Sequence, residues 1–278
     1  MFSPTLLSSN KLKELRKLKQ KKYRKQKNYI LGEGFRLFEA ALNASRIDIK
    51  ELVISEDFRT SAQGKFVMDV AEKRNIAVFI TDEPKMKAIS EDVTPPGILF
   101  VVEKKTTNQI SLLDLEENII LYLEKISEPG NLGTIIRSAC WFGVNTIILS
   151  PECVDPWNPK SVRASAGTIF ETNIYTDVNF LWLKDHFKKK KYQFIATVVS
   201  DGTPLHQWSI DRKSILFLGQ EASGLSKEII KHADVHINIP GYGNVESLNL
   251  SVAAGIILYE TTRAGDKNLP TCRFDFDK

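Results

Sequence analysis

The chain has 278 residues, 42% of them hydrophobic and 26% charged, and a formal net charge of +4. This is an ordinary globular composition, and the length allows one large domain or two of moderate size, of which we expect two. No stretch is apolar for long enough to cross a bilayer, and the N-terminal charges follow a short apolar run instead of preceding it as in a secretory signal, so a cytoplasmic protein without membrane contact is expected.

The cysteines and histidines do not suggest a disulfide framework or a metal site. Cys140, Cys153 and Cys272 are odd in number and widely spaced, and no Cys-x-x-Cys pair occurs among them. His232 and His236 are four residues apart, but a predicted change from helix to strand falls between them. We therefore expect reduced thiols and no bound metal.

Positive charge is concentrated near the N-terminus. Residues 11–27 hold ten Lys or Arg and one Glu, so this segment carries +9 and the rest of the chain −5. Lysine and arginine neutralise phosphates and release their counterions, so the segment predicts a contact with RNA or DNA. The predicted RNA-binding side chains are Lys11, Lys13, Arg16, Lys17, Lys21, Lys22, Arg24 and Lys25.

The basic segment is predicted to be helical. Ser8, Ser9 and Asn10 can cap a helix, and leucines at positions 12, 15 and 18 recur at the spacing of one helix face. The alternative reading is that these leucines merely dock a solvated helix on the body of the protein.

Residues 5–103 are expected to form a compact α/β module. A helix is predicted over residues 34–44 and another over residues 66–74, with strands over residues 51–54, 76–80 and 98–102. The polar segment 104–117 is predicted to be a linker, which gives an N-terminal domain of residues 1–103 and a C-terminal domain of residues 118–278.

After the linker, strand-like and helical segments alternate. Short apolar runs occur at residues 119–126, 146–150, 194–199, 215–219 and 235–239, and a long helix is predicted from about Leu248 to Thr262. This alternation predicts a parallel sheet with helices on both faces. Ligands of such sheets bind beyond the carboxyl ends of the strands, so the loops there are candidate site segments.

Three of these loops have unusual sequences. Residues 127–134 (SEPGNLGT) lead into a predicted helix with Arg137, and the other two are residues 219–226 (GQEASGLS) and 240–249 (PGYGNVESLN). The first lacks the third glycine of a dinucleotide-binding loop, and no acidic residue ends the next strand, which disfavours that reading. Each loop alone could be an ordinary turn or helix cap, but together they are expected to converge at one edge of the sheet.

The segments NLGTIIRSA, FLGQEASGL and IPGYGNVESLNLSVAAG resemble, in order and spacing, the three motifs of the SpoU (TrmH-like) RNA 2′-O-ribose methyltransferases of the SPOUT superfamily. The segment SPECVDPWNPKSVRASAGTIF is similar to the family's sequence after the first motif. Residues 1–103 are similar to its N-terminal RNA-substrate-binding domain. The resemblance covers nearly the whole chain up to about Thr262.

The resemblance implies an α/β fold with a parallel sheet and a deep C-terminal trefoil knot, preceded by a smaller α/β ribosomal-protein-like RNA-binding domain. It also implies a homodimer through the methyltransferase domain, with S-adenosylmethionine in the knot. The implied cofactor contacts are Thr197, Leu218, Gly219, Ile239 and Leu248. The implied catalytic residues are Asn131, Arg137, Glu221, Ser247 and Asn249. Gln220 and Gly241 depart from the commoner asparagine and methionine, so the shape of the cofactor wall is expected to differ.

The implied reaction is methyl transfer from S-adenosylmethionine to a ribose 2′-hydroxyl of structured RNA. A guanidinium is protonated at ordinary pH, so Arg137 is expected to clamp the adjacent phosphate more than to act as a free base. The basic segment and the separate binding domain favour 23S ribosomal RNA over transfer RNA. The alternatives are a tRNA 2′-O-ribose methyltransferase, a base-nitrogen methyltransferase and a non-catalytic RNA-binding or ribosome-assembly factor on the same fold.

Two aromatic features complete the sequence predictions. Trp141 and Phe142 close the predicted helix after the first motif and are expected in the core. Tyr242 lies in a glycine-flanked loop and is expected to touch a ligand.

Overall fold

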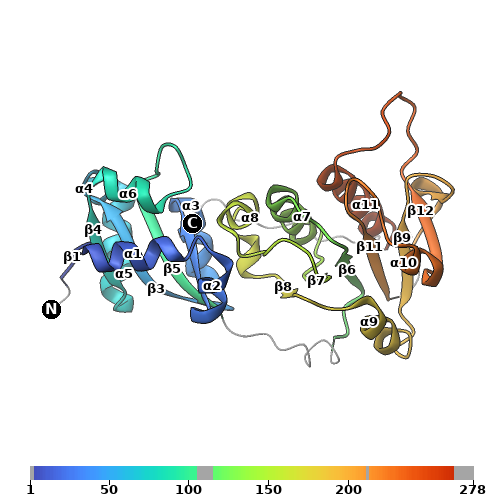
Figure 1. Cartoon of the computed structure of the whole chain (residues 1–278), viewed down its shortest axis with the longest axis horizontal. Coiled ribbons are helices and arrows are strands. Elements are labelled where there is room, and N and C mark those ends of the chain that lie inside the picture. Colours follow the sequence, from blue (N-terminus) through green and yellow to red (C-terminus); the bar gives the residue numbers. More distant parts are fainter. Residues whose placement is uncertain (1–2, 105–114, 211–212, 266–278) are drawn as a thin grey trace. The chain divides into compact units, whose positions relative to one another are not determined.

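The computed structural model describes residues 3–104, 115–210 and 213–265 of the chain, and Figure 1 shows its helices and strands in sequence colours. The chain divides into two compact units, one of Met1–Thr106 with Asp155–Glu171 and one of Thr107–Val154 with Thr172–Lys278. The segment 155–171 was expected in the C-terminal domain but groups with the N-terminal unit. Most of the predicted linker, residues 105–114, lies outside the described residues, as does Cys272.

The first unit is built on a mixed sheet of five strands. From edge to edge these are β1 (Thr5–Leu6), β4 (Ala77–Thr81), β3 (Ile47–Ser55), β5 (Ile98–Lys104) and β2 (Tyr29–Glu33). Strand β3 runs parallel to β4 and antiparallel to β5, and β2 closes the sheet antiparallel to β5. Strand β2 was not predicted, because Gly32 interrupts its pattern of strand-forming residues. In the sheet this glycine leaves room for a neighbouring ring, since a Cβ atom there would overlap Phe100 of β5.

Helices cover both faces of this sheet. Leu15 of α1 (Ser9–Lys17) and Met86 of α6 (Glu83–Ile89) pack with Leu99 and other residues of one face. On the opposite face, Phe38 of α3 (Phe35–Asn43) packs edge-on against Phe100, with ring centroids 5.8 Å apart. The remaining helices are α2 (Lys21–Lys27), α4 (Glu56–Thr60), α5 (Ala62–Arg74), α8 (Pro159–Ala164) and the 3-10 turn η2 (Thr168–Phe170).

The second unit contains a seven-stranded sheet in which every pair is parallel, so the predicted parallel α/β fold is confirmed. From edge to edge its strands are β10 (Thr203–Pro204), β12 (Val235–Asn238), β9 (Gln193–Thr197), β11 (Ser214–Leu218), β6 (Ile119–Leu123), β7 (Thr146–Leu149) and β8 (Asn173–Tyr175). From β6 the chain first adds β7 and β8 on one side and later places β9 and β11 on the other side, so the order of strand addition reverses between β6 and β11. Ligands of open parallel sheets bind at such a switch point.

Helices lie on both faces of this sheet as well. Phe180 of α9 (Phe180–Phe187) and Ile229 of α10 (Lys227–His232) pack with Tyr122 and Phe217 on one face. Helices α7 (Pro129–Trp141) and α11 (Leu250–Gly265) lie beside one another on the other face (Figure 1). The 3-10 turn η3 (Leu205–Gln207) follows β10.

One core prediction for the second unit is wrong. Trp141, the last residue of α7, is 60% exposed. Its neighbour Phe142 packs edge-on against Tyr259 of α11 at a centroid distance of 6.1 Å. The expected core position therefore fits Phe142, which is partly buried, and not Trp141.

Candidate active site

The first site loop begins where β6 ends. The strand ends at Leu123, three residues before the predicted end, because Lys125 adopts a left-handed backbone with φ 54°. Its N–H donates to Ser150 Oγ at 2.9 Å, and the N–H of Ile126 donates to Cys153 Sγ at 3.3 Å. Burial raises the pKa of the Cys153 thiol above its usual value. The thiol therefore stays neutral and acts as a structural hydrogen-bonding group.

Helix α7 starts earlier than predicted, so the first motif lies inside the helix. Pro129 occupies the first helical turn, and the carboxylate of Glu128 accepts the N–H of Gly130 at 3.1 Å. A proline at this position and an acidic cap both favour a helix start. As a result Asn131 lies in the first turn of α7, and Arg137 lies on its exposed side.

The second loop, residues 219–226, folds tightly on itself. The N–H of Gly224 donates to the carbonyl of Gln220 at 2.9 Å, and a Cβ atom on Gly219 would overlap the backbone of Gly224. The far end of the loop is held by a buried carboxylate, because the N–H of Ser226 donates to Glu124 Oε2 at 2.7 Å. Glu124 is 8% exposed. Glu124 was not among the predicted site residues, although an acidic residue directly after an apolar strand is a usable signal.

The third loop, residues 240–249, ends in a helix cap. Asn249 Oδ1 accepts the N–H groups of Ser251 at 2.9 Å and Val252 at 3.3 Å, so Asn249 caps α11. The predicted helix began two residues earlier, at Leu248. The amide of Asn249 still has its NH₂ group available for a contact outside the helix.

The three loops meet through their side chains. Asn249 Nδ2 donates to Asn131 Oδ1 at 3.2 Å, and Asn131 Nδ2 donates to Glu221 Oε1. One predicted catalytic residue from each loop thus belongs to a single hydrogen-bonded chain. The side chains of Arg137 and Ser247 are exposed and make no hydrogen bond with any residue in the described ranges.

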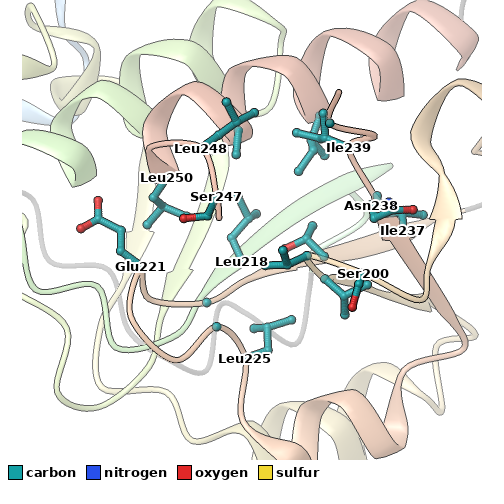
Figure 2. Close-up of a pocket in the computed structure, with 18 of the residues that line it drawn as sticks. Ser200, Leu218, Glu221, Leu225, Ile237, Asn238, Ile239, Ser247, Leu248 and Leu250 are labelled. Carbon is teal, nitrogen blue, oxygen red and sulfur yellow. The ribbon is translucent and has the colours of Figure 1, made fainter. Parts of the chain in front are cut away.

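A cavity of about 980 Å³ lies beside this chain of hydrogen bonds. It is lined by all five predicted cofactor residues, and Figure 2 shows the pocket with Glu221 and Ser247 on one side and Ile237 and Asn238 on the other. The wall contains loops two and three together with the ends of β9, β11 and β12. Thr197 of this wall donates its hydroxyl to the carbonyl of Phe217 at 2.9 Å.

The cavity has a negative character. Asp201, Glu221 and Glu246 line it, and its described lining includes no lysine or arginine. The side-chain oxygen of Asn238, which also lines it, is buried without a hydrogen-bond partner in the described part of the chain. Buried acceptors usually have a donor. The cavity therefore suits a ligand with positive charge, an apolar body and an N–H or O–H donor.

The structure changes the list of candidate RNA-binding residues. The basic segment is interrupted at residues 18–20, and Arg24 is 5% exposed. Its guanidinium donates to the carbonyls of Leu18 at 2.8 Å and Lys19 at 2.7 Å. It also donates twice to Asp155 Oδ2, at 2.9 and 2.5 Å. Arg24 is therefore a buried structural residue, contrary to the prediction.

The other basic residues differ in their surroundings. Lys11 is mostly buried and pairs with Glu51 at 2.6 Å and Glu14 at 3.1 Å. Lys17 lies over the ring of Tyr23, 5.4 Å from its centroid. The predicted residues that are exposed at the surface are Lys13, Arg16, Lys17, Lys21, Lys22 and Lys25.

Other site classes find no support in the described ranges, residues 3–104, 115–210 and 213–265. They contain no group of three His, Cys, Asp or Glu side chains placed to hold a metal ion. The rings of His232 and His236 each lie at hydrogen-bond distance from a main-chain carbonyl, of Glu228 and Ile230. No helix in these ranges is long and apolar enough to span a membrane.

Two family models match the chain, each on one part of it. The model described as SpoU rRNA Methylase family matches residues 118–259, which include all three site loops. The model described as MRM3-like substrate binding domain matches residues 9–99, in the first unit.

Two curated relatives and one solved structure match this chain over most of its length and most of their own. The 23S rRNA (guanosine-2′-O-)-methyltransferase RlmB of Neisseria meningitidis is 28% identical over 83% of this chain and 93% of the relative. The 23S rRNA (guanosine(2553)-2′-O)-methyltransferase RlmP of Bacillus subtilis is 28% identical over 90% of this chain and 95% of the relative. The AdoMet-bound rRNA methyltransferase of Sinorhizobium meliloti superposes with a TM-score of 0.79 at 29% identity, covering 93% of this chain and 96% of that one.

Proposed function

Because the chain belongs to the SpoU rRNA methylase family, we propose that it transfers a methyl group from S-adenosylmethionine to a ribose 2′-hydroxyl of 23S ribosomal RNA. The observation that carries this proposal is the hydrogen-bonded chain from Asn249 through Asn131 to Glu221, which joins the three motif loops beside a cavity of cofactor size. Two relatives that match most of the chain are named as 23S rRNA ribose methyltransferases.

The cavity suits S-adenosylmethionine. Its apolar wall, which includes Leu218, Ile239 and Leu248, fits an adenosine moiety, and its carboxylates complement a sulfonium. The unpartnered oxygen of Asn238 is placed to accept from an amino or hydroxyl group. The residues that would hold the cofactor are the predicted five together with Asn238. When bound, the cofactor supplies an electrophilic methyl group on a positively charged sulfur.

The chain's own residues position the RNA for this reaction. Arg137 presents an exposed, planar guanidinium fork on α7, which suits the phosphate next to the target ribose. Asn131 and Asn249 hold the ribose through their amides, and Glu221 fixes the orientation of Asn131. The hydroxyl proton would pass to that phosphate or to a transiently deprotonated guanidine of Arg137 as the methyl group is transferred. Holding both reactants in line supplies much of the rate acceleration.

The first unit supplies a basic surface for the RNA. Lys13, Arg16, Lys21 and Lys22 are exposed on α1 and α2 and make no ion pair with a described residue. Lysine and arginine at such positions contact phosphates without reading sequence, so they contribute affinity and salt dependence.

We also propose that the protein is a homodimer through its second unit. Val252, Ile256 and Tyr259 recur at helical spacing on α11 and are 51%, 37% and 51% exposed. Trp141, at the end of the neighbouring α7, is also exposed. Exposed apolar side chains that repeat along one helix are typical of a protein interface. The trefoil knot and the cytoplasmic location stay predictions.

The proposed reaction can be tested with tritium-labelled S-adenosylmethionine and unmodified 23S rRNA transcribed in vitro. A 2′-O-methyl group blocks alkaline cleavage at its own nucleotide, so the label is expected in alkali-resistant dinucleotides. Label released as mononucleotides would indicate base methylation and contradict the proposal. Label entering only a transfer RNA fraction in a parallel reaction would contradict the ribosomal substrate.

A further inference from the structure

Three exposed apolar side chains line the cavity, and a fourth, that of Tyr242, lies between two glycines that line it. Tyr242 is 98% exposed, Val245 78%, Val199 69% and Leu248 44%. Val199, Val245 and Leu248 line the cavity, and so do the two glycines that flank Tyr242. Single exposed apolar residues are common, but a group of four around one cavity indicates a surface that meets a partner.

Tyr242 and the glycines on either side of it do not pack against the rest of the described chain. A Cβ atom on Gly241 or Gly243 would have no other atom within 4 Å, so both neighbours of Tyr242 lie in open space. With 98% of the side chain exposed, the ring contributes almost nothing to the core. The fold therefore gives no structural reason for an aromatic residue at this position.

The chemistry of a nucleotide keeps its base close to the reacting hydroxyl. The base is bonded to C1′ of the ribose, next to the C2′ atom that carries that hydroxyl. A ribose held by Asn131 and Asn249, as in the proposed reaction, therefore brings its own base close to loop three, which contains Asn249. Loop three carries Ser247 and Asn249 toward one end and Tyr242 toward the other, so a single short segment can contact both the ribose and the base.

We propose that Tyr242 stacks on the base of the target nucleotide after that base has left its helical stack, an inference that rests on the proposed function. Proteins recognise unpaired RNA bases by stacking them on aromatic side chains. Stacking is tolerant of base identity, so Tyr242 supplies affinity and position more than sequence choice. A second copy of the chain is the less suitable occupant, because α7 and α11 already offer it a separate apolar face through Trp141 and Ile256.

The test compares Tyr242→Ala, Tyr242→Phe and Tyr242→Trp in the full chain with 23S rRNA transcript as the probe. The alanine variant is expected to raise KM for RNA by about 5- to 100-fold, because it removes one stacking partner. The phenylalanine and tryptophan variants keep an aromatic face and are expected to retain the wild-type KM. Cofactor affinity, measured by calorimetry, and molecular mass, measured by light scattering, are expected to be unchanged in all three.

The controls separate this inference from its alternatives. Leu181→Ala removes an apolar side chain, 43% exposed, from α9 and is expected to leave KM for RNA unchanged. An unchanged KM in Tyr242→Ala, a weaker cofactor affinity in it or a lower mass would each overturn the stacking role. A wild-type enzyme that methylates no rRNA overturns the proposed function as well, whereas active wild type with an equally active Tyr242→Ala overturns only the role of Tyr242.

Discussion

Arg137 and Arg24 show that the same residue type has opposite uses in the two units. The guanidinium of Arg137 is exposed and contacts no described partner by hydrogen bond, whereas that of Arg24 is buried and fully engaged. From the sequence alone, both arginines count as cations that can contact RNA. Only burial separates them, and burial depends on partners such as Asp155 that lie far away in the sequence.

Arg137→Ala is expected to lower kcat by roughly 100- to 1000-fold while leaving cofactor affinity unchanged, because it removes the phosphate clamp but no cavity wall. Arg137→Lys keeps the charge but loses the planar fork, and an intermediate rate is expected. Single-turnover methyl transfer to 23S rRNA measures the effect. Wild-type kinetics in the alanine variant would rule out this role.

Arg24→Ala is expected to destabilise the first unit by about 3 kcal/mol, because it leaves the Asp155 carboxylate, only 11% exposed, without its ion-pair partner. The urea midpoint of that unit, followed by circular dichroism, reports the change. Lys22→Ala is the matched control, since it removes an exposed cation of the same helix and is expected to weaken RNA binding without shifting the midpoint. An unshifted midpoint in Arg24→Ala would show that the pair is not stabilising.

At the scale of elements, periodicity predicted the order of strands and helices in the second unit but misplaced several ends. Strand β6 stops early because Lys125 turns left-handed, and α7 starts early because Pro129 and Glu128 favour a helix start. These ends depend on single residues and their caps, which a repeating apolar pattern does not describe. The convergence of loops was predicted correctly, because all parallel strands place their carboxyl ends at one edge.

Loop two is expected to depend on Glu124, since this carboxylate holds the end of a segment that forms one wall of the cavity. Glu124→Ala leaves the N–H of Ser226 without its acceptor, at a cost of about 1–3 kcal/mol, and we expect weaker binding of S-adenosylmethionine. Glu124→Gln keeps an acceptor oxygen and is expected to retain most of the affinity. Calorimetric titration of both variants measures this, and equal affinities would contradict it.

At the scale of the whole molecule, the sequence resemblance identified the family and the parallel sheet, but it did not predict how the residues divide between the units. Because residues 118–278 are continuous in sequence, they were expected to form one domain. In the structure, however, Asp155–Glu171 belongs to the first unit. Phe170 of this segment contacts Phe100 at a centroid distance of 6.5 Å. Packing between distant segments is a tertiary property, and local sequence patterns carry little information about it.

The apolar face of α7 and α11 makes a prediction about assembly. Ile256→Glu places a charge in the proposed interface, and the variant is expected to run as a monomer in light scattering while the wild type has twice that mass. Leu181→Glu on α9 is the control and is expected to keep the wild-type mass. A wild type of monomer mass would contradict the proposed homodimer.

Because Asp155–Glu171 belongs to the first unit, that unit consists of two separate segments of the chain, which limits how it can be exchanged between proteins. A fragment cut after residue 104 would lack Asp155 and Phe170, so it would expose Phe100 and leave the buried Arg24 without its counter-charge. The first unit therefore cannot be transferred as one continuous segment of the chain. A recombinant protein that exchanges this unit has to carry both segments, Met1–Thr106 and Asp155–Glu171. Such exchanges are therefore expected to work only between chains that share the 155–171 segment.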